Sequence, residues 1–161
     1  MLVVRNRHQL WAGDGDSTVK VFDLKDPDDL PVVISTGGEK RVDEMCYGDG
    51  MVLAANNAED IVASDLTSGP FVTFFSTKTL TILKKIVFHN ATNGVEQCAF
   101  DRAADKFYLS LPELNGKFDP NHPTTTGGFI AEIDPHTLMV TGTFPVGTVS
   151  PPAWTSGHIT T

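Results

Sequence analysis

The stretch Val19-Lys20-Val21-Phe22-Asp23-Leu24 decides the fold, because its pattern recurs twice further along the chain. The two copies, each fifty-odd residues after the one before, are Val72-Thr73-Phe74-Phe75-Ser76-Thr77 and Ile130-Ala131-Glu132-Ile133-Asp134-Pro135. Each copy is an apolar run that ends at a small polar residue and is followed by a polar turn, which is typical of a β-strand. A repeat of this length indicates one structural unit copied along the chain.

Each unit contains four strand-like runs, which in the second unit cover residues 42–47, 51–55, 71–75 and 82–88. Gly, Asn and Asp cluster at the joints, as tight turns between antiparallel strands require. The run 71–75 is apolar on both faces, as expected of a sheet packed between two others. Four short antiparallel strands repeated in phase predict β-propeller blades, whereas a sandwich or barrel does not explain the copied unit.

The predicted fold is therefore all-β, a single domain of about three four-stranded blades. The blades cover residues 1–36, 41–89 and 94–147, and a fourth begins at 149–161. Propellers close with about four to eight blades, so the ring is incomplete. Either the missing blades belong to a longer chain, or copies of this chain form a homo-oligomer. If three blades stand open, we expect the outward faces of the terminal blades to expose Val19, Val21, Phe129 and Ile133, which a closed ring would cover.

Composition excludes some partners. The 161 residues are 40% hydrophobic and 20% charged, with a formal net charge of -8. Such an acidic chain repels phosphate backbones, so no nucleic-acid partner is expected. No segment approaches 18 consecutive apolar residues, and the N-terminus does not read as a signal peptide, so we expect no membrane partner.

The two cysteines, Cys46 and Cys98, are expected to be buried free thiols. Corresponding residues of stacked sheets lie about 10 Å apart. A disulfide requires Cα atoms within about 7 Å.

Three segments carry a resemblance to a known family: residues 10–24, 54–57 and 133–138. Over about residues 1–149, the chain resembles the lactonase-like, YVTN-type β-propeller repeat proteins. The resemblance implies blade architecture and an extracytoplasmic location. Families of this kind include hydrolases, quinoprotein-like redox subunits and binding scaffolds, and the fold does not select among them.

Glu44 and Glu96 each lie two residues before a cysteine, so they occupy equivalent places in adjacent inner strands. Asp43, Asn56, Asn57 and Asn93 occupy neighbouring turn or strand-end positions. Oxygen ligands of this kind suit calcium. The resemblance implies a metal site of Glu44, Glu96 and Asn57 at the central channel, where the cation would act as a Lewis acid. The alternative is that both glutamates are solvated residues at strand starts.

No complete catalytic constellation is present in the sequence, and the five histidines lack zinc-type spacing. We therefore predict a binding or interaction scaffold, and interpret His136 as an ordinary turn residue. The joints 58–69 and 112–127 are long enough to recognise a small-molecule ligand. A lactonase-like metal-dependent hydrolase is the alternative, so the sequence leaves open whether the protein is an enzyme.

Overall fold

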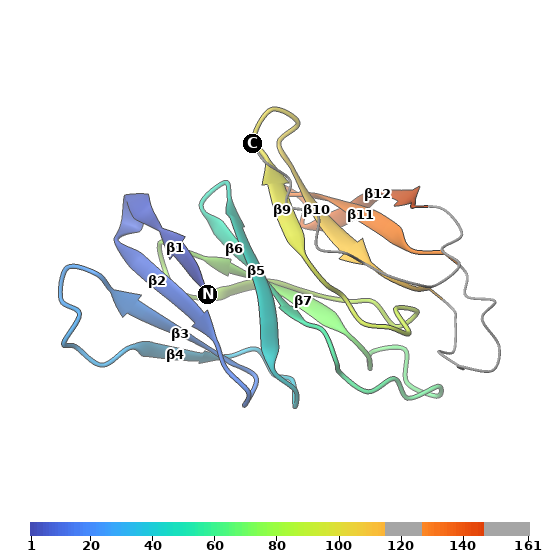
Figure 1. The fold of residues 1–161 in the computed structure, drawn as a ribbon, viewed down its shortest axis with the longest axis horizontal. Coiled ribbons are helices and arrows are strands. Elements are labelled where there is room, and N and C mark those ends of the chain that lie inside the picture. The colour runs from blue at the N-terminus through green and yellow to red at the C-terminus, as the bar shows by residue number, and fades with distance from the viewer. Residues whose placement is uncertain (115–126, 147–161) are drawn as a thin grey trace.

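The computed structural model describes residues 1–114 and 127–146. These residues form three four-stranded antiparallel sheets, which lie side by side in chain order (Figure 1). The first sheet contains β1 (Leu2–Val4), β2 (Gln9–Gly13), β3 (Thr18–Asp23) and β4 (Val32–Ser35), with the 3-10 helix η1 (Arg5–Arg7) between β1 and β2. The second contains β5 (Val42–Gly48), β6 (Met51–Asn56), β7 (Phe71–Ser76) and β8 (Ile82–Val87). The third contains β9 (Cys98–Asp101), β10 (Lys106–Leu111), β11 (Phe129–Asp134) and β12 (Met139–Pro145).

The sheets are blades of the predicted kind. Within each sheet, strands that follow one another in the chain are hydrogen-bonded neighbours. The all-β class and the four-stranded antiparallel unit are therefore confirmed. The three described sheets form an open arc and do not close into a ring (Figure 1). The predicted start of a fourth blade, 149–161, lies outside the described residues.

Turn chemistry explains why the strands end where they do. Asp49 and Gly50 have φ of 45° and 74°, and they form the two-residue loop that pairs Gly48 with Met51. Two consecutive left-handed residues match the right-handed twist of the flanking strands, and Asp-Gly is a preferred pair for this turn. The joint Gly48-Asp49-Gly50 is thus a tight hairpin.

Two hydrophobic cores hold the three sheets together, because the central sheet packs on both faces. All six residues of β6 are buried, and alternate ones face opposite neighbours. Val52 joins the core shared with the first sheet, whereas Leu53 joins the core shared with the third. Phe75 packs 5.7 Å from Trp11 of the first sheet, and Phe74 packs 5.2 Å from Phe107 of the third, measured between ring centroids. The expectation that residues 71–75 are covered on both faces is confirmed.

The prediction for the outward faces of the terminal blades was wrong. Val19, Val21 and Ile133 are only 0%, 4% and 0% exposed, and Phe129 packs against the core shared with the second sheet. Successive side chains of a strand point to opposite faces, so a choice that is wrong by one residue exchanges inside for outside. In β3 it is Phe22, not Val21, that points away from the second sheet.

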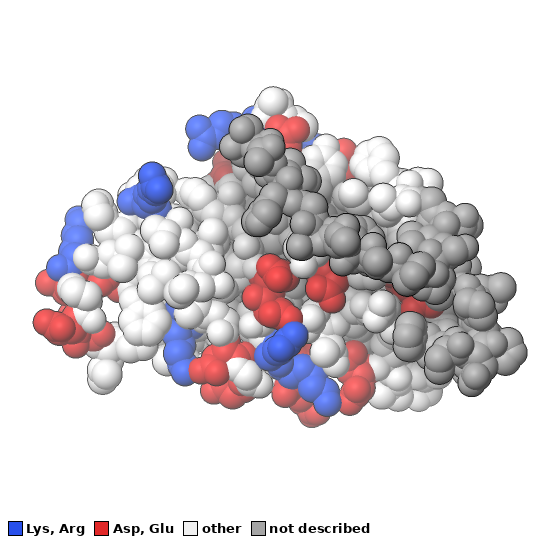
Figure 2. Space-filling view, in the orientation of Figure 1, with Lys and Arg blue, Asp and Glu red and all other residues white. Residues whose placement is uncertain are grey.

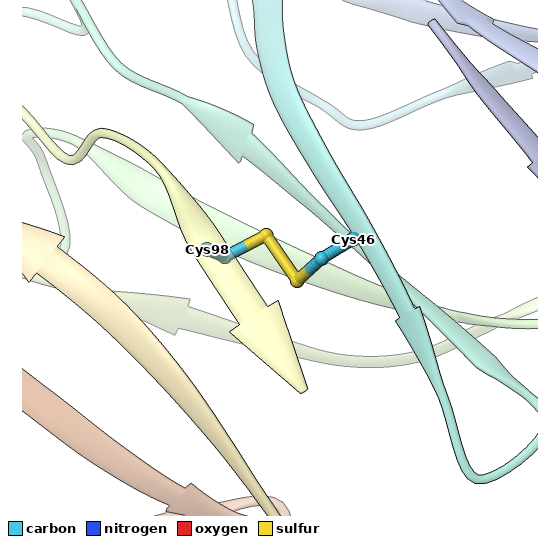
Figure 3. Close-up of a disulfide and its surroundings, with 2 residues drawn as sticks. All are labelled: Cys46 and Cys98. Carbon is cyan, nitrogen blue, oxygen red and sulfur yellow. A yellow bond between two sulfur atoms is a disulfide. The ribbon is translucent and has the colours of Figure 1, made fainter. Parts of the chain in front are cut away.

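The expectation of two free thiols was also wrong. Cys46 and Cys98 form a disulfide between β5 and β9, with their Cα atoms 5.7 Å apart (Figure 3). The spacing of about 10 Å applies to sheets stacked face to face. Blades instead spread from a common axis, so their inner strands come closer together than the middles of the sheets. The two inner strands are therefore covalently joined.

Candidate functional site

Acidic and amide side chains meet where β5 begins and β6 ends. Asp43 lies near the start of β5, Asn57 directly follows β6, and Glu96 lies two residues before β9. Asn57 Nδ2 donates a hydrogen bond to Asp43 Oδ2 at 3.0 Å. Glu96 is also hydrogen-bonded to Asn57 and lies within the electrostatic influence of Asp43. The second blade and the chain leading into the third blade therefore share one polar cluster.

A β-bulge in β5 positions Asp43. The register passes from Val42 opposite Asn56 to Met45 opposite Ala54, so that both Asp43 and Glu44 lie opposite the single residue between them. A bulge re-aims the side chains that it carries. Asp43 bonds Asn57, and its other neighbour is Arg41, whose guanidinium nitrogen lies 2.6 Å from Asp43 Oδ2.

The electrostatics of the cluster centre on Glu96. Burial raises the pKa of Glu96 above its ordinary value, and the negative charge of Asp43 raises it further. The hydrogen bond from Asn57 opposes these effects, while the charge of Glu44 adds to them. The cluster thus holds excess negative charge, which a cation would relieve.

A cavity of about 470 Å³ opens beside the cluster, and Asn57, Glu96 and Asn93 line it. Glu59 and Asp60, from the β6–β7 joint, also contribute to its wall. The side chain of Asn57 is only 9% exposed, and its Oδ1 atom is buried without a hydrogen-bond partner. Carboxylate and amide oxygens are suitable cation ligands, so Asp43, Glu96 and Asn57 fit a hard divalent cation in donor type.

Only some of the predicted site residues line the cavity. Asn57 and Glu96 line one cavity, and Asp43 is hydrogen-bonded to Asn57 beside it. Glu44 acts on Glu96 through its charge but is not among the residues that line the cavity. Asn56 lies elsewhere: its Nδ2 donates to Ser17 Oγ at 2.7 Å, which ties the second blade to the first.

A second cluster lies at the opposite end of β5, and the sequence analysis missed it. Asp49, Asp105 and His136 come from three turns, and one potential ligand atom from each lies within 4.8 Å of the others. His136 Nε2 is 2.9 Å from Asp105 Oδ2, and His136 Nδ1 is 3.9 Å from Asp49 Oδ2. The signal was present in the repeat, since Asp49 and Asp105 both lie in turns that follow inner strands. The sequence pattern around His136 indicates only a turn residue.

The remaining described histidines have simpler surroundings. His89 Nδ1 lies 3.1 Å from the carbonyl oxygen of Ser68. His8 is exposed in the turn between β1 and β2. His122 and His158 lie outside the described residues, as does most of the joint 112–127.

Charge on the molecular surface is mixed. Figure 2 shows acidic side chains over the middle and the lower edge of one face, with Lys and Arg among them. No continuous basic patch is visible on the described part of this face, in keeping with the net charge of -8. In residues 1–114 and 127–146, none of the helices is long and apolar enough to cross a membrane.

Comparison with solved structures identifies the architecture. The chain is similar to the β-propeller domain of Cps50 (Swd1) from Myceliophteria thermophila, with a TM-score of 0.51 and 14% identity. The match covers 91% of this chain and 54% of that chain, so this chain spans about half the length of its neighbour. No protein-family model matches the sequence, and no curated protein matches it. The β-propeller fold is thus shown, whereas membership of the lactonase-like family stays a prediction.

Proposed function

We propose that this protein is a binding scaffold whose first blade packs against a blade of a second copy, so that two copies complete one propeller. The observation that carries the proposal is the outward face of the first sheet. Val3 pairs with Leu10, and Leu10 pairs with Phe22, so these three residues form an apolar row across β1, β2 and β3. Within its own sheet, this row lies on the face opposite the buried Trp11.

The row is incompletely covered. Val3 is 49% exposed, and Val33, on the same face of β4, is 55% exposed. Leu10 and Phe22 are half-buried. In the central sheet, the corresponding positions pack against a neighbouring blade. Apolar patches of this kind mark interfaces.

A second copy would supply the number of blades that a closed ring needs. Propellers close with about four to eight blades. Three described blades fall below this range, whereas two copies provide six. The chain also spans 54% of its structural neighbour, which fits half of a propeller. In such a ring, the first blade of one copy packs against the third blade of the other.

Light scattering coupled to size-exclusion chromatography tests the proposal. We expect a mass close to twice the 17.4 kDa of one chain. Phe22→Glu, which introduces a charge into the apolar row, should convert the dimer to a monomer. Leu30→Glu is the matched control, because Leu30 is 94% exposed on the same blade but lies in the β3–β4 joint. A wild-type monomer at every concentration, or a dimer that Phe22→Glu leaves intact, would contradict the proposal.

A second candidate function is a metal-dependent hydrolase of the lactonase type. The buried, unpartnered Asn57 Oδ1 beside Glu96 and Asp43 favours it, because Arg41 is paired with Asp43 and leaves this amide oxygen without a partner. A calcium ion held by these residues would polarise a substrate carbonyl oxygen. The cavity of about 470 Å³ is large enough for a small lactone or ester.

Calcium binding and hydrolysis test the second candidate separately. Calcium should raise the melting temperature of the wild type, because a ligand that binds only the folded state stabilises it. Glu96→Gln should abolish both the shift and any hydrolysis of a lactone and ester panel. Asp28→Asn, at an exposed position in the β3–β4 joint, should change neither. The absence of a calcium shift in the wild type would rule out this site.

A further inference from the structure

We propose that Asp49, Asp105 and His136 form a binding site for a transition-metal dication of the zinc type, which bridges the second and third blades. The site is independent of the cluster around Glu96. Asp43 lies near the start of β5 and Asp49 directly follows its end, so the strand separates the two sites by about 20 Å. Neither the scaffold proposal nor the calcium candidate uses these three residues.

The three side chains reach one point because their turns lie at the same end of the blades. Asp49 lies in the β5–β6 turn, Asp105 in the β9–β10 turn and His136 in the β11–β12 turn. In a four-stranded meander, the first and third turns lie at the same end. Asp49 belongs to the second blade, whereas Asp105 and His136 belong to the third. A metal ion at this point therefore cross-links two blades.

The side chain of Asp134 holds the turn that carries His136. Asp134 Oδ1 accepts hydrogen bonds from the backbone N–H groups of His136 and Thr137, each at 2.9 Å. Its other oxygen, Oδ2, bonds Lys106 Nζ at 3.0 Å. This support fixes the backbone of His136 relative to β10, whereas its imidazole is 65% exposed.

The three side chains are close enough to reach one small cation. One potential ligand atom from each of Asp49, Asp105 and His136 lies within 4.8 Å of the other two. Ligand atoms about 2.0–2.2 Å from a tetrahedral zinc ion lie about 3.3–3.6 Å from one another. His136 approaches Asp105 through Nε2, at 2.9 Å, and Asp49 through Nδ1, at 3.9 Å. Because only one ring nitrogen can bind a given ion, metal binding requires these side chains to rotate so that both carboxylates meet the same nitrogen.

The donor set selects the metal. One imidazole nitrogen and two carboxylate oxygens suit zinc and its neighbours in the first transition row. Calcium takes oxygen ligands, so an imidazole nitrogen in the donor set disfavours it. A cavity of about 290 Å³ adjoins Asp49 and Asp105, and Tyr47 and Arg102 also line it. The cavity would leave room beside Asp49 and Asp105 for a water molecule or an anionic group, although His136 is not among the residues that line it.

The test measures metal binding by the purified, oxidised chain. Zinc chloride should raise the melting temperature, and cobalt(II) should give a visible absorption band of a four- or five-coordinate site. Reductant is omitted, and a thiol assay confirms that Cys46 and Cys98 remain paired, because free thiolates bind both metals. Calcium should leave the cobalt band unchanged.

Two variants test whether the zinc shift and the cobalt band arise from Asp49, Asp105 and His136. His136→Asn and Asp49→Asn should each abolish the zinc shift and the cobalt band, and Asn tolerates the left-handed φ of 45° at position 49. His8→Asn is the matched control, because His8 is also an exposed turn histidine, with φ of 55°. It should retain wild-type binding. No cobalt band in the wild type, or an unchanged band in both cluster variants while circular dichroism shows them folded, would overturn the proposal.

Discussion

At the scale of single residues, one position of the repeat makes the same kind of turn hydrogen bond in all three blades. Asp23, Ser76 and Asp134 end the third strand of their sheets, and each side-chain oxygen accepts a backbone N–H of the turn that follows. These hydrogen bonds satisfy turn donors that no strand can reach. They explain why the sequence pattern ends at a small polar residue in every copy.

A glycine at the end of β5 tests the packing between blades. The ring of Phe100 occupies the space that a Cβ atom at Gly48 would need. Gly48→Ala should therefore reduce the free energy of unfolding by about 1–3 kcal/mol, through overpacking. Chemical denaturation measures the change. Gly15→Ala is the control, since nothing lies within 4 Å of an added Cβ there, and it should be close to neutral. Equal effects at both positions would contradict the packing described.

The raised pKa of Glu96 predicts a pH-dependent effect. An acid whose pKa is raised by folding destabilises the folded state when ionised, so the penalty is absent below about pH 4 and grows as the pH rises above the pKa of the unfolded chain. Glu96→Gln should therefore raise the melting temperature at pH 7 and leave it unchanged near pH 4. Thermal unfolding at the two pH values measures this. Glu39→Gln, at an exposed position, should have little effect at either. A Glu96→Gln variant less stable than the wild type at pH 7 would contradict the electrostatic account.

At the scale of elements, the inner strands β5 and β9 belong to different blades and are covalently linked by a disulfide. The disulfide links residues 52 apart in sequence, and its two halves lie on facing strands. A crosslink that closes a loop of this length restricts the unfolded chain. The second and third blades should therefore separate only after the bond is broken.

Removing the disulfide should cost about 2–4 kcal/mol of unfolding free energy. The double variant Cys46→Ala/Cys98→Ala should match the wild type measured in dithiothreitol. Dithiothreitol should have no effect on the double variant, which serves as the internal control. A wild type whose unfolding is unchanged by reductant, with both thiols shown to be free, would contradict a stabilising bridge.

The repeat predicted the positions of the strands well, but it did not predict which side chains of a strand face the neighbouring sheet. Strand positions follow from apolar runs and turn residues, which are local properties, so the four-stranded unit was readable from the sequence. Which alternate residues face a neighbour depends on register, and here the prediction exchanged Val21 for Phe22. The approach of Cys46 to Cys98 and the meeting of His136 with Asp49 depend on how blades spread from their axis. Neither can be obtained from spacing along the chain.

At the scale of the whole molecule, the arc has two different ends. The outward face of the first blade carries the apolar row of Val3, Leu10 and Phe22. The outward face of the third blade includes Tyr108, whose ring lies 6.5 Å from that of Phe144 and whose hydroxyl bonds Glu132 Oε2 at 3.3 Å. Unlike ends suit a head-to-tail contact, and two such contacts close a ring with twofold symmetry.

A crystal structure of the purified chain, read with its symmetry-related copies, tests the central claim most directly. The account predicts six blades in one ring, with Phe22 of one copy buried against the third blade of the other and the same contact repeated across the twofold axis. A lone arc, in which Val3, Phe22 and Val33 are ordered and face solvent, would contradict it.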